Sequence, residues 1–271
     1  MTSRTVTLWD PPITAKVYET GDGDPVLFLH SGSGITPSDP LVAALAATGR
    51  RVIAPRHPGF VDPEELDELR DVHDLALYHE ELVSKLGVHS LPVIGHSFGG
   101  MVAAEYAAHY PTRVSKLVLV APVGLWNEDY PTADFFIAFP FGMADLLWHD
   151  SQSPEAVAAM TAMAQGDDEE ASKSDDPVTA LMLRVLPGLI TLGKYMWPLP
   201  DRGLVRRLRL ISSPTLVIWG EKDKLAPSRY ADDFVAKIPD ARAAFIPDAG
   251  HMAPYEKTEE FTKLVDDFLK S

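Results

Sequence analysis

The chain has 271 residues, of which 46% are hydrophobic, and its 39 acidic and 24 basic side chains give a formal net charge of −15. This acidic balance makes nucleic acids and anionic membrane surfaces poor partners. The absence of cysteine excludes disulfides, thiolate metal sites and a cysteine nucleophile. The length suits one α/β domain that carries an insertion.

Targeting and metal-binding patterns are also missing from the sequence. No stretch resembles a signal peptide and no apolar run is long enough to span a membrane, so we expect a cytoplasmic protein that acts on a small molecule. The nine histidines show no ligand spacing such as H-E-x-x-H, so we expect no metal and no other cofactor. The sequence leaves monomer and homodimer equally open.

Short apolar runs and helical patterns alternate through the first third of the chain. Residues 6–9 and 15–19 predict an antiparallel pair at the edge of a sheet. The runs 26–29 and 51–55 predict further strands, and 41–47 and 69–86 predict helices. Strands that alternate with helices predict an α/β fold, with a mostly parallel, doubly wound sheet covered on both faces.

A glycine-rich segment, Gly95-His96-Ser97-Phe98-Gly99-Gly100, lies between an apolar run at 91–94 and an alanine-rich helix at 101–108. A G-x-S-x-G pattern between a strand and a helix is typical of a nucleophile elbow. The turn is so tight that glycines are needed on both sides of Ser97. The pattern predicts an exposed serine hydroxyl at the N-terminus of a helix, where backbone amides face developing negative charge.

The alternation resumes with a strand at 116–121 and then stops between residues 123 and 205. Helix starts occur there at Ser153-Pro154-Glu155 and Asp176-Pro177, and the acidic stretch from 165 to 176 predicts a solvated loop. We interpret 123–205 as a helical cap inserted into a core formed by 1–122 and 206–271.

An acid and a histidine follow two later predicted strands. Asp223 comes just after the run 214–220, and His251 just after the run 243–247. In a parallel sheet all carboxyl-end loops open at one edge, so these side chains can meet Ser97 there. The chain order Ser, Asp, His differs from the orders of chymotrypsin-like and subtilisin-like enzymes.

Together these motifs resemble the α/β-hydrolase family over nearly the whole chain. The first of them is His30-Ser31-Gly32-Ser33-Gly34 after the strand 26–29, where Ser31 replaces the first glycine of the usual His-Gly pair. The resemblance implies that Ser97 is the nucleophile, His251 the base and Asp223 the residue that orients the base. Asp248 is the rival acid. The expected oxyanion donors are the backbone amides of Phe98 and Gly32.

The roof of the substrate pocket is expected to come from the cap, because no other segment is available for it. His30, His96 and the Arg56–Phe60 loop are interpreted as structural. We predict five further pocket residues from their places near the nucleophile, the histidine and the ends of the cap helices: Ser31, Phe139, Trp148, Trp197 and Met252.

Serine at position 97 argues against epoxide hydrolases and haloalkane dehalogenases, whose chemistry needs a carboxylate there. The resemblance points to a subgroup of carboxylesterases and C–C hydrolases that act on products of aromatic ring cleavage. Those C–C hydrolases commonly carry tryptophan after the catalytic histidine, where this chain has Met252. Acidic residues also far outnumber basic ones in 123–205, which disfavours an anionic substrate unless Arg184 or Lys194 points inward.

The main expectation is therefore a serine hydrolase for a small to medium, neutral and apolar carboxylic ester. The alternatives are a C–C hydrolase of the meta-cleavage type, a lactonase, a cofactor-free perhydrolase, and a non-catalytic ligand-binding homologue.

Overall fold

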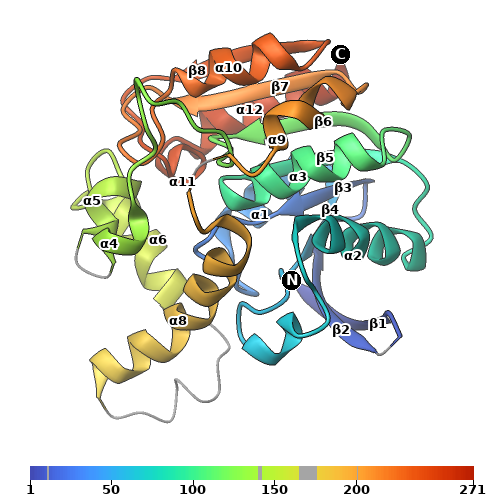
Figure 1. Ribbon diagram of the computed structural model, residues 1–271, viewed down its shortest axis with the longest axis horizontal. Coiled ribbons are helices and arrows are strands. Elements are labelled where there is room, and N and C mark those ends of the chain that lie inside the picture. The colour runs from blue at the N-terminus through green and yellow to red at the C-terminus, as the bar shows by residue number, and fades with distance from the viewer. Residues whose placement is uncertain (11, 140–141, 165–175, 200) are drawn as a thin grey trace.

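The computed structural model describes residues 1–10, 12–139, 142–164, 176–199 and 201–271, and it is built around one eight-stranded sheet (Figure 1). The strand order is β1-β2-β4-β3-β5-β6-β7-β8. β2 pairs antiparallel with both of its neighbours, and the remaining pairs are parallel. The strands are β1 (Thr2–Leu8), β2 (Ile13–Thr20), β3 (Asp24–Leu29), β4 (Arg50–Pro55), β5 (Leu91–His96), β6 (Val114–Val120), β7 (Thr215–Gly220) and β8 (Ala241–Ile246).

Two hydrophobic cores lie on opposite faces of this sheet, because successive side chains of a strand point to opposite sides. In β3, for example, Leu27 and Leu29 enter one core while Val26 and Phe28 enter the other. The first core is covered by α2 (Val72–Lys85), α3 (Phe98–His109) and α10 (Tyr230–Lys237). The second is covered by α1 (Pro40–Ala47), α11 (Ala253–Glu256) and α12 (Thr258–Lys270). The expected doubly wound α/β sheet is confirmed.

The segment between β6 and β7 contributes helices instead of strands. Figure 1 shows α4, α5, α6 and α8 grouped beside one end of the sheet, and α9 returning along α3. The bounds of these helices are α4 (Phe135–Ala138), α5 (Met143–Leu147), α6 (Pro154–Ala164), α8 (Pro177–Met196) and α9 (Leu204–Arg207), followed by the 3₁₀ turn η2 (Leu208–Leu210). Nearly all of the predicted loop at 165–176 lies outside the described residues.

The predicted elements agree with the structure within a few residues, with some differences. Trp9 has a positive φ of 72° and belongs to the turn after β1, not to the strand. The helix expected from residue 69 begins at Val72, where Asp71 caps it, and a short 3₁₀ turn, η1 (Pro63–Leu66), precedes it. The pattern predicted neither α10 nor α11, and α11, with four residues, is too short to show a helical period.

Within the described ranges, no helix is both long enough and apolar enough to cross a bilayer.

A largely buried ion pair fastens α9, where the chain returns from the insertion, to α3. Glu105 on α3 is almost fully buried, and its two carboxylate oxygens accept from the Nε and Nη2 atoms of Arg207 on α9 at 2.6 and 2.7 Å. The pairing is bidentate, the strongest geometry for these two side chains. The neighbouring carboxylate raises the pKa of Arg207.

We predict that Arg207→Met, which leaves the Glu105 carboxylate buried without its partner, lowers the free energy of unfolding by about 3 kcal/mol. Urea denaturation followed by circular dichroism measures this change. The control is Lys263→Met, which breaks the exposed Lys263–Asp267 pair and should leave the midpoint unchanged. Equal effects of the two substitutions would contradict the structural role of the buried pair.

Candidate active site

Ser97 lies in a strained turn between β5 and α3. Its φ and ψ are 56° and −114°, outside the regions that side-chain-bearing residues usually adopt. A Cβ on Gly95 would overlap the carbonyl oxygen of Gly99, and one on Gly99 would overlap the carbonyl oxygens of Leu29 and His30. The two glycines therefore let the turn close and let α3 begin directly against the end of β3.

The three side chains expected to act together are in hydrogen-bond contact. His251 Nε2 lies 2.7 Å from Ser97 Oγ, and His251 Nδ1 lies 2.7 Å from Asp223 Oδ2. All three are buried, and Ser97 is 7% exposed. Asp223 is held by three further donors: the indole N–H of Trp219 and the backbone amides of Leu225 and Ala226. Asp248 is exposed, and within the described ranges it makes no hydrogen bond or ion pair with this group.

His96, the residue before Ser97, ties the serine turn to the histidine loop. Its Nε2–H donates to the carbonyl oxygen of His251 at 2.9 Å. Burial lowers the pKa of His96 to about 3, so the ring is neutral. The interpretation of His96 as a residue that acts through a loop hydrogen bond agrees with this contact.

Two backbone amides face the same region without an acceptor in the part of the chain that the structure describes. Phe98 is the first residue of α3, so its N–H has no intrahelical partner. The N–H of Gly32, in the loop after β3, is likewise not used in a hydrogen bond there. Both residues line the small chamber of about 70 Å³ next to Ser97.

A larger cavity of about 380 Å³ adjoins this chamber. The two share several apolar lining residues from the inserted helices, the Gly32 loop and the residue after His251: Gly32, Ser33, Phe135, Met143, Leu147, Leu192 and Met252. Of the predicted pocket residues, Ser31 lines the chamber, Phe139 and Trp148 line the larger cavity, and Met252 lines both.

The structure places Trp197 elsewhere, and the expectation that it lines the pocket is corrected. Its side chain is 55% exposed and packs edge-on against Phe136, and it belongs to neither cavity lining. It follows the last residue of α8, on the outer side of that helix. The residues that α8 turns toward the cavity lie earlier in the helix, at Arg184, Val185, Gly188, Leu189 and Leu192.

Basic side chains line the larger cavity despite the acidic composition of the insertion. Lys16, Arg56 and Arg184 contribute to its wall, and none of its described lining residues is an aspartate or glutamate. Arg56 pairs with Glu65 at 2.7 Å behind the wall. Lys194, the other candidate cation, donates instead to the carbonyl oxygen of Leu66. The loop that begins at Arg56 was interpreted as structural, and Lys16 was not predicted at the site, because both residues come from the core and not from the insertion.

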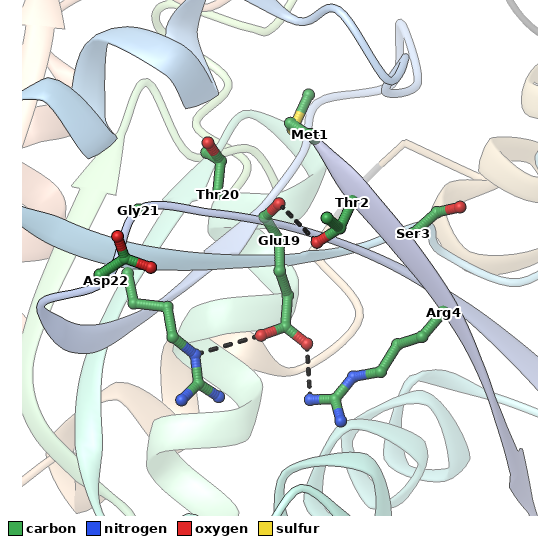
Figure 2. A pocket seen from close by; sticks show the side chains of 9 residues that line it. Met1, Thr2, Ser3, Arg4, Glu19, Thr20, Gly21 and Asp22 are labelled. Carbon is green, nitrogen blue, oxygen red and sulfur yellow. Dashed lines mark hydrogen bonds and ion pairs between the residues drawn. The ribbon is translucent and has the colours of Figure 1, made fainter.

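A wider hollow lies at the far edge of the sheet, between the chain start and β2. Figure 2 shows the guanidinium group of Arg4 directed at the carboxylate of Glu19. Arg51 pairs with the same carboxylate through its Nε at 3.1 Å. The hollow measures about 760 Å³ and is lined by residues 1–4, 19–22 and 51. Its charged groups already bind one another, and none of the residues around Ser97 reaches it. Within the described ranges, no cluster of three or more histidine and carboxylate side chains is arranged to hold a metal ion.

A family model described as "Alpha/beta hydrolase family" matches residues 26–264, so the chain belongs to the α/β-hydrolase family and is a hydrolase. A relative from Comamonas testosteroni, named 2-hydroxy-6-oxononadienedioate/2-hydroxy-6-oxononatrienedioate hydrolase, is 28% identical over 93% of this chain and 89% of its own length. The 2-hydroxymuconate semialdehyde hydrolase of Pseudomonas putida is 26% identical over 94% of this chain and 90% of its own.

Solved structures agree on the fold. The meta-cleavage product hydrolase from Pseudomonas fluorescens IP01 superposes with a TM-score of 0.70 at 20% identity, over 95% of this chain and 94% of that one. An esterase from Exiguobacterium antarcticum superposes with a TM-score of 0.73 at 19% identity, over 96% and 97%. At these identities the two matches show the fold alone.

Buried neutral histidines make the stability of the protein depend on pH. Burial lowers the pKa of His30, His79 and His96 from 6.5 to about 3. The unfolded chain therefore binds protons between pH 6.5 and 3 that the folded chain does not bind, so the free energy of unfolding falls as the pH decreases through this range.

We predict that His79→Gln, which removes one such group, makes this loss of stability between pH 7 and pH 5 shallower. Urea unfolding at several pH values measures the slope. His73→Gln, at an exposed position of the same helix, is the control and should keep the wild-type slope. The prediction is wrong if both variants follow the wild-type curve.

Proposed function

We propose that the protein is a serine hydrolase that cleaves a carbon–carbon bond in a vinylogous diketone bearing a carboxylate. The observation that carries the proposal is the cavity beside Ser97, which is largely apolar and has the basic side chains of Arg184, Arg56 and Lys16 among its lining residues. An apolar wall suits a conjugated carbon chain, and a guanidinium binds a carboxylate in the bidentate geometry that it favours.

The names of two relatives also support cleavage of a carbon–carbon bond. The named substrates of the Comamonas testosteroni and Pseudomonas putida enzymes combine an oxo group, a diene and acid groups in one short chain. The net negative charge of the insertion disfavours an anionic substrate, but most of that charge lies away from the cavity wall. The charge that matters is that of the cavity wall, where the basic side chains gather.

Ser97 and His251 have the contacts needed for nucleophilic attack. His251 takes the proton of Ser97 as Oγ forms a bond to the substrate carbonyl carbon, and the carbonyl electron pair moves onto oxygen. Asp223 holds the imidazole in the tautomer that accepts this proton and stabilises the charged ring. The amides of Phe98 and Gly32 would bind the oxyanion.

The second step decides the substrate class. The 2-hydroxydienoate first moves its hydroxyl proton to C5, which gives the 2,6-dioxo form with a double bond between C3 and C4. Collapse of the tetrahedral intermediate at C6 then breaks the C5–C6 bond. The electron pair of that bond passes through the C3–C4 double bond to the 2-oxo group, and the fragment leaves as a dienolate that takes up the proton held by His251. Water, activated by His251, then hydrolyses the acyl-enzyme to a carboxylic acid. A cation beside the distant oxo and carboxylate groups stabilises the dienolate as its charge develops.

The inserted helices act as the cap in this proposal. They close the cavity over Ser97 and exclude water while the carbanion-like leaving group forms. The neutral carboxylic ester expected from the sequence stays a prediction, since the same serine, histidine and oxyanion donors serve ester hydrolysis. Met252 in place of tryptophan remains the residue that separates this chain from the usual pattern of the C–C hydrolases.

We predict that a 2-hydroxy-6-oxohexa-2,4-dienoate is cleaved with a higher kcat/KM than a neutral p-nitrophenyl ester, and that Ser97→Ala abolishes both activities. Loss of dienoate absorbance and release of p-nitrophenol measure the two reactions. Arg184→Met should raise KM for the dienoate by about 10- to 100-fold, because a hydrogen bond to a charged group is worth about 1.5–3 kcal/mol. It should change KM for the neutral ester little.

Arg209→Met, at an exposed position of η2, is the matched control and should leave both reactions unchanged. Preference for the neutral ester, with no effect of Arg184→Met on dienoate cleavage, would overturn the C–C assignment and favour the ester.

A second prediction concerns the acid. Asp223→Asn should reduce kcat on the order of 10⁴-fold, because an amide favours the wrong imidazole tautomer. Asp248→Asn is the control, since asparagine tolerates the positive φ of 50° at that position. The ranking of the two kcat values tests which aspartate supports His251, and the reverse ranking would move the role to Asp248.

A further inference from the structure

Three histidines form a hydrogen-bonded chain beneath the loop that carries Gly32. His30 directly follows β3, His57 lies two residues after β4, and His79 lies on α2. The backbone N–H of His57 donates to His30 Nε2 at 2.9 Å, and His57 Nε2 lies 3.2 Å from the carbonyl oxygen of His30. On its other side, His57 Nδ1 lies 3.2 Å from His79 Nε2.

The contacts leave one proton arrangement for all three rings. A backbone N–H can only donate, so His30 Nε2 carries a lone pair and the proton of the neutral ring sits on Nδ1. A carbonyl oxygen can only accept, so the proton of His57 sits on Nε2 and its Nδ1 is an acceptor. His79 must therefore present Nε2–H to His57. One neutral tautomer at each position satisfies every contact.

The surroundings keep the rings neutral and fixed. All three are fully buried, and burial lowers the pKa of His30 and His79 to about 3 and that of His57 well below its usual value. The rings of Phe60 and Phe98 pack against His57 with centroids 5.9 and 5.2 Å away. Protonation of His30 or His57, or a tautomer change at any of the three rings, would set two donors, or two acceptors, against each other.

The end of the chain reaches the peptide that carries the expected oxyanion donor. His30 Nδ1–H donates to the carbonyl oxygen of Ser31 at 2.7 Å. The C=O of Ser31 and the N–H of Gly32 belong to one planar trans peptide, in which the two bonds point in opposite directions. Holding the carbonyl against His30 therefore turns the Gly32 N–H away from that ring, and Gly32 lines the Ser97 chamber.

A glycine-rich loop does not hold this orientation by itself, because glycine populates a wide range of backbone conformations. The Gly34 N–H also donates to the Ser31 carbonyl oxygen, at 3.1 Å, and supports the same orientation of the Ser31–Gly32 peptide. This hydrogen bond, however, lies within the loop itself. The three histidines connect the loop to α2, a helix of the core. Leu192 of α8 covers Gly32 from the other side, where a Cβ on that glycine would come within 2.9 Å of it.

We propose that His79, acting through His57 and His30, is a positioning residue that holds the Ser31–Gly32 peptide with its N–H directed at the oxyanion. His79 touches neither the chamber nor the larger cavity among their described lining residues, so its effect on the reaction is indirect. The inference rests on the proposed attack by Ser97 but not on whether the scissile bond is C–C or ester.

The test uses pairs of variants that keep or remove a single hydrogen bond. His79→Phe removes the donor to His57, whereas His79→Gln supplies an amide N–H at the same reach. His30→Asn carries an amide N–H at the level of Nδ1 and keeps the bond to the Ser31 carbonyl, whereas His30→Gln places its amide at the level of Nε2 and loses that bond. His73→Phe on the exposed face of α2 is the control.

The readouts are kcat and KM for a p-nitrophenyl ester, and the inhibition constant of an alkyl boronic acid. The boronic acid bonds to the serine oxygen and places a charged oxygen among the oxyanion donors. Butyrate competes for the same site but forms no bond to the serine oxygen, and its affinity is measured beside that of the boronic acid. Thermal melting reports folding.

We expect His79→Phe and His30→Gln to lower kcat by about 10- to 100-fold, less than the about 10²- to 10³-fold loss from deleting an oxyanion donor. KM and butyrate affinity should change little, and boronic acid affinity should fall in parallel with kcat. His79→Gln should recover most of both kcat and boronic acid affinity. His30→Asn keeps the bond to the Ser31 carbonyl but loses the acceptor for the His57 N–H, so it should recover only part of both.

Equal kcat and boronic acid affinity in all folded variants would overturn the inference while leaving the attack by Ser97 intact. The inference is also overturned if His79→Phe lowers the affinities for butyrate and for the boronic acid equally and His79→Gln does not restore them. Such a result would indicate general unfolding. If the wild-type protein releases no burst of p-nitrophenol and binds no boronic acid, the proposed nucleophile is wrong instead.

Discussion

The close approach of α3 to the end of β3 is the constraint on which the site depends. Ser97 takes a left-handed φ between β5 and α3, and the chain can make this turn only because Gly95 and Gly99 have no side chains. The helix start then lies against the carbonyl oxygens of Leu29 and His30. One contact therefore brings together the serine, the first amide of the helix and the loop that follows β3.

The other functional loops are fastened to this turn by polar contacts across the sheet edge. His96 donates to the backbone of His251, and His251 reaches Ser97 and Asp223 with its two ring nitrogens. The insertion is fastened at the same place, since Met252 N–H donates to the carbonyl oxygen of Leu147 and Glu256 accepts from the backbone of His149. The site is thus a set of loops whose backbones hold one another.

The insertion shows why local charge and overall charge are different properties. Its composition is strongly acidic, yet the cavity below it is bordered by basic side chains, two of which belong to the core. Acidic side chains on the insertion act mainly as caps or surface groups, such as Asp134 at the start of α4 and Asp145 bonded to Ser151. A charged ligand responds most to the groups that line its path, because solvent screens the more distant ones.

The fold class, the tight turn at Ser97 and the meeting of Ser97, His251 and Asp223 could be predicted from the amino-acid sequence. These depend on local rules: the period of a strand, the glycines of a tight turn, and the rule that carboxyl-end loops of parallel strands share one edge. A motif of a few residues carries each of them, so the chain could be interpreted without knowing how distant parts pack.

The lining of the cavity could not be predicted from the sequence, because it depends on how distant segments pack together. Trp197 and Trp148 have similar local patterns, but Trp148 is buried in the cavity wall and Trp197 is exposed, because the rotation of each helix depends on what it packs against. Arg56 lies more than a hundred residues from Arg184 in the chain and shares a cavity with it. The contacts among His30, His57 and His79 likewise join three separate elements, and the packing of β3, β4 and α2 creates them.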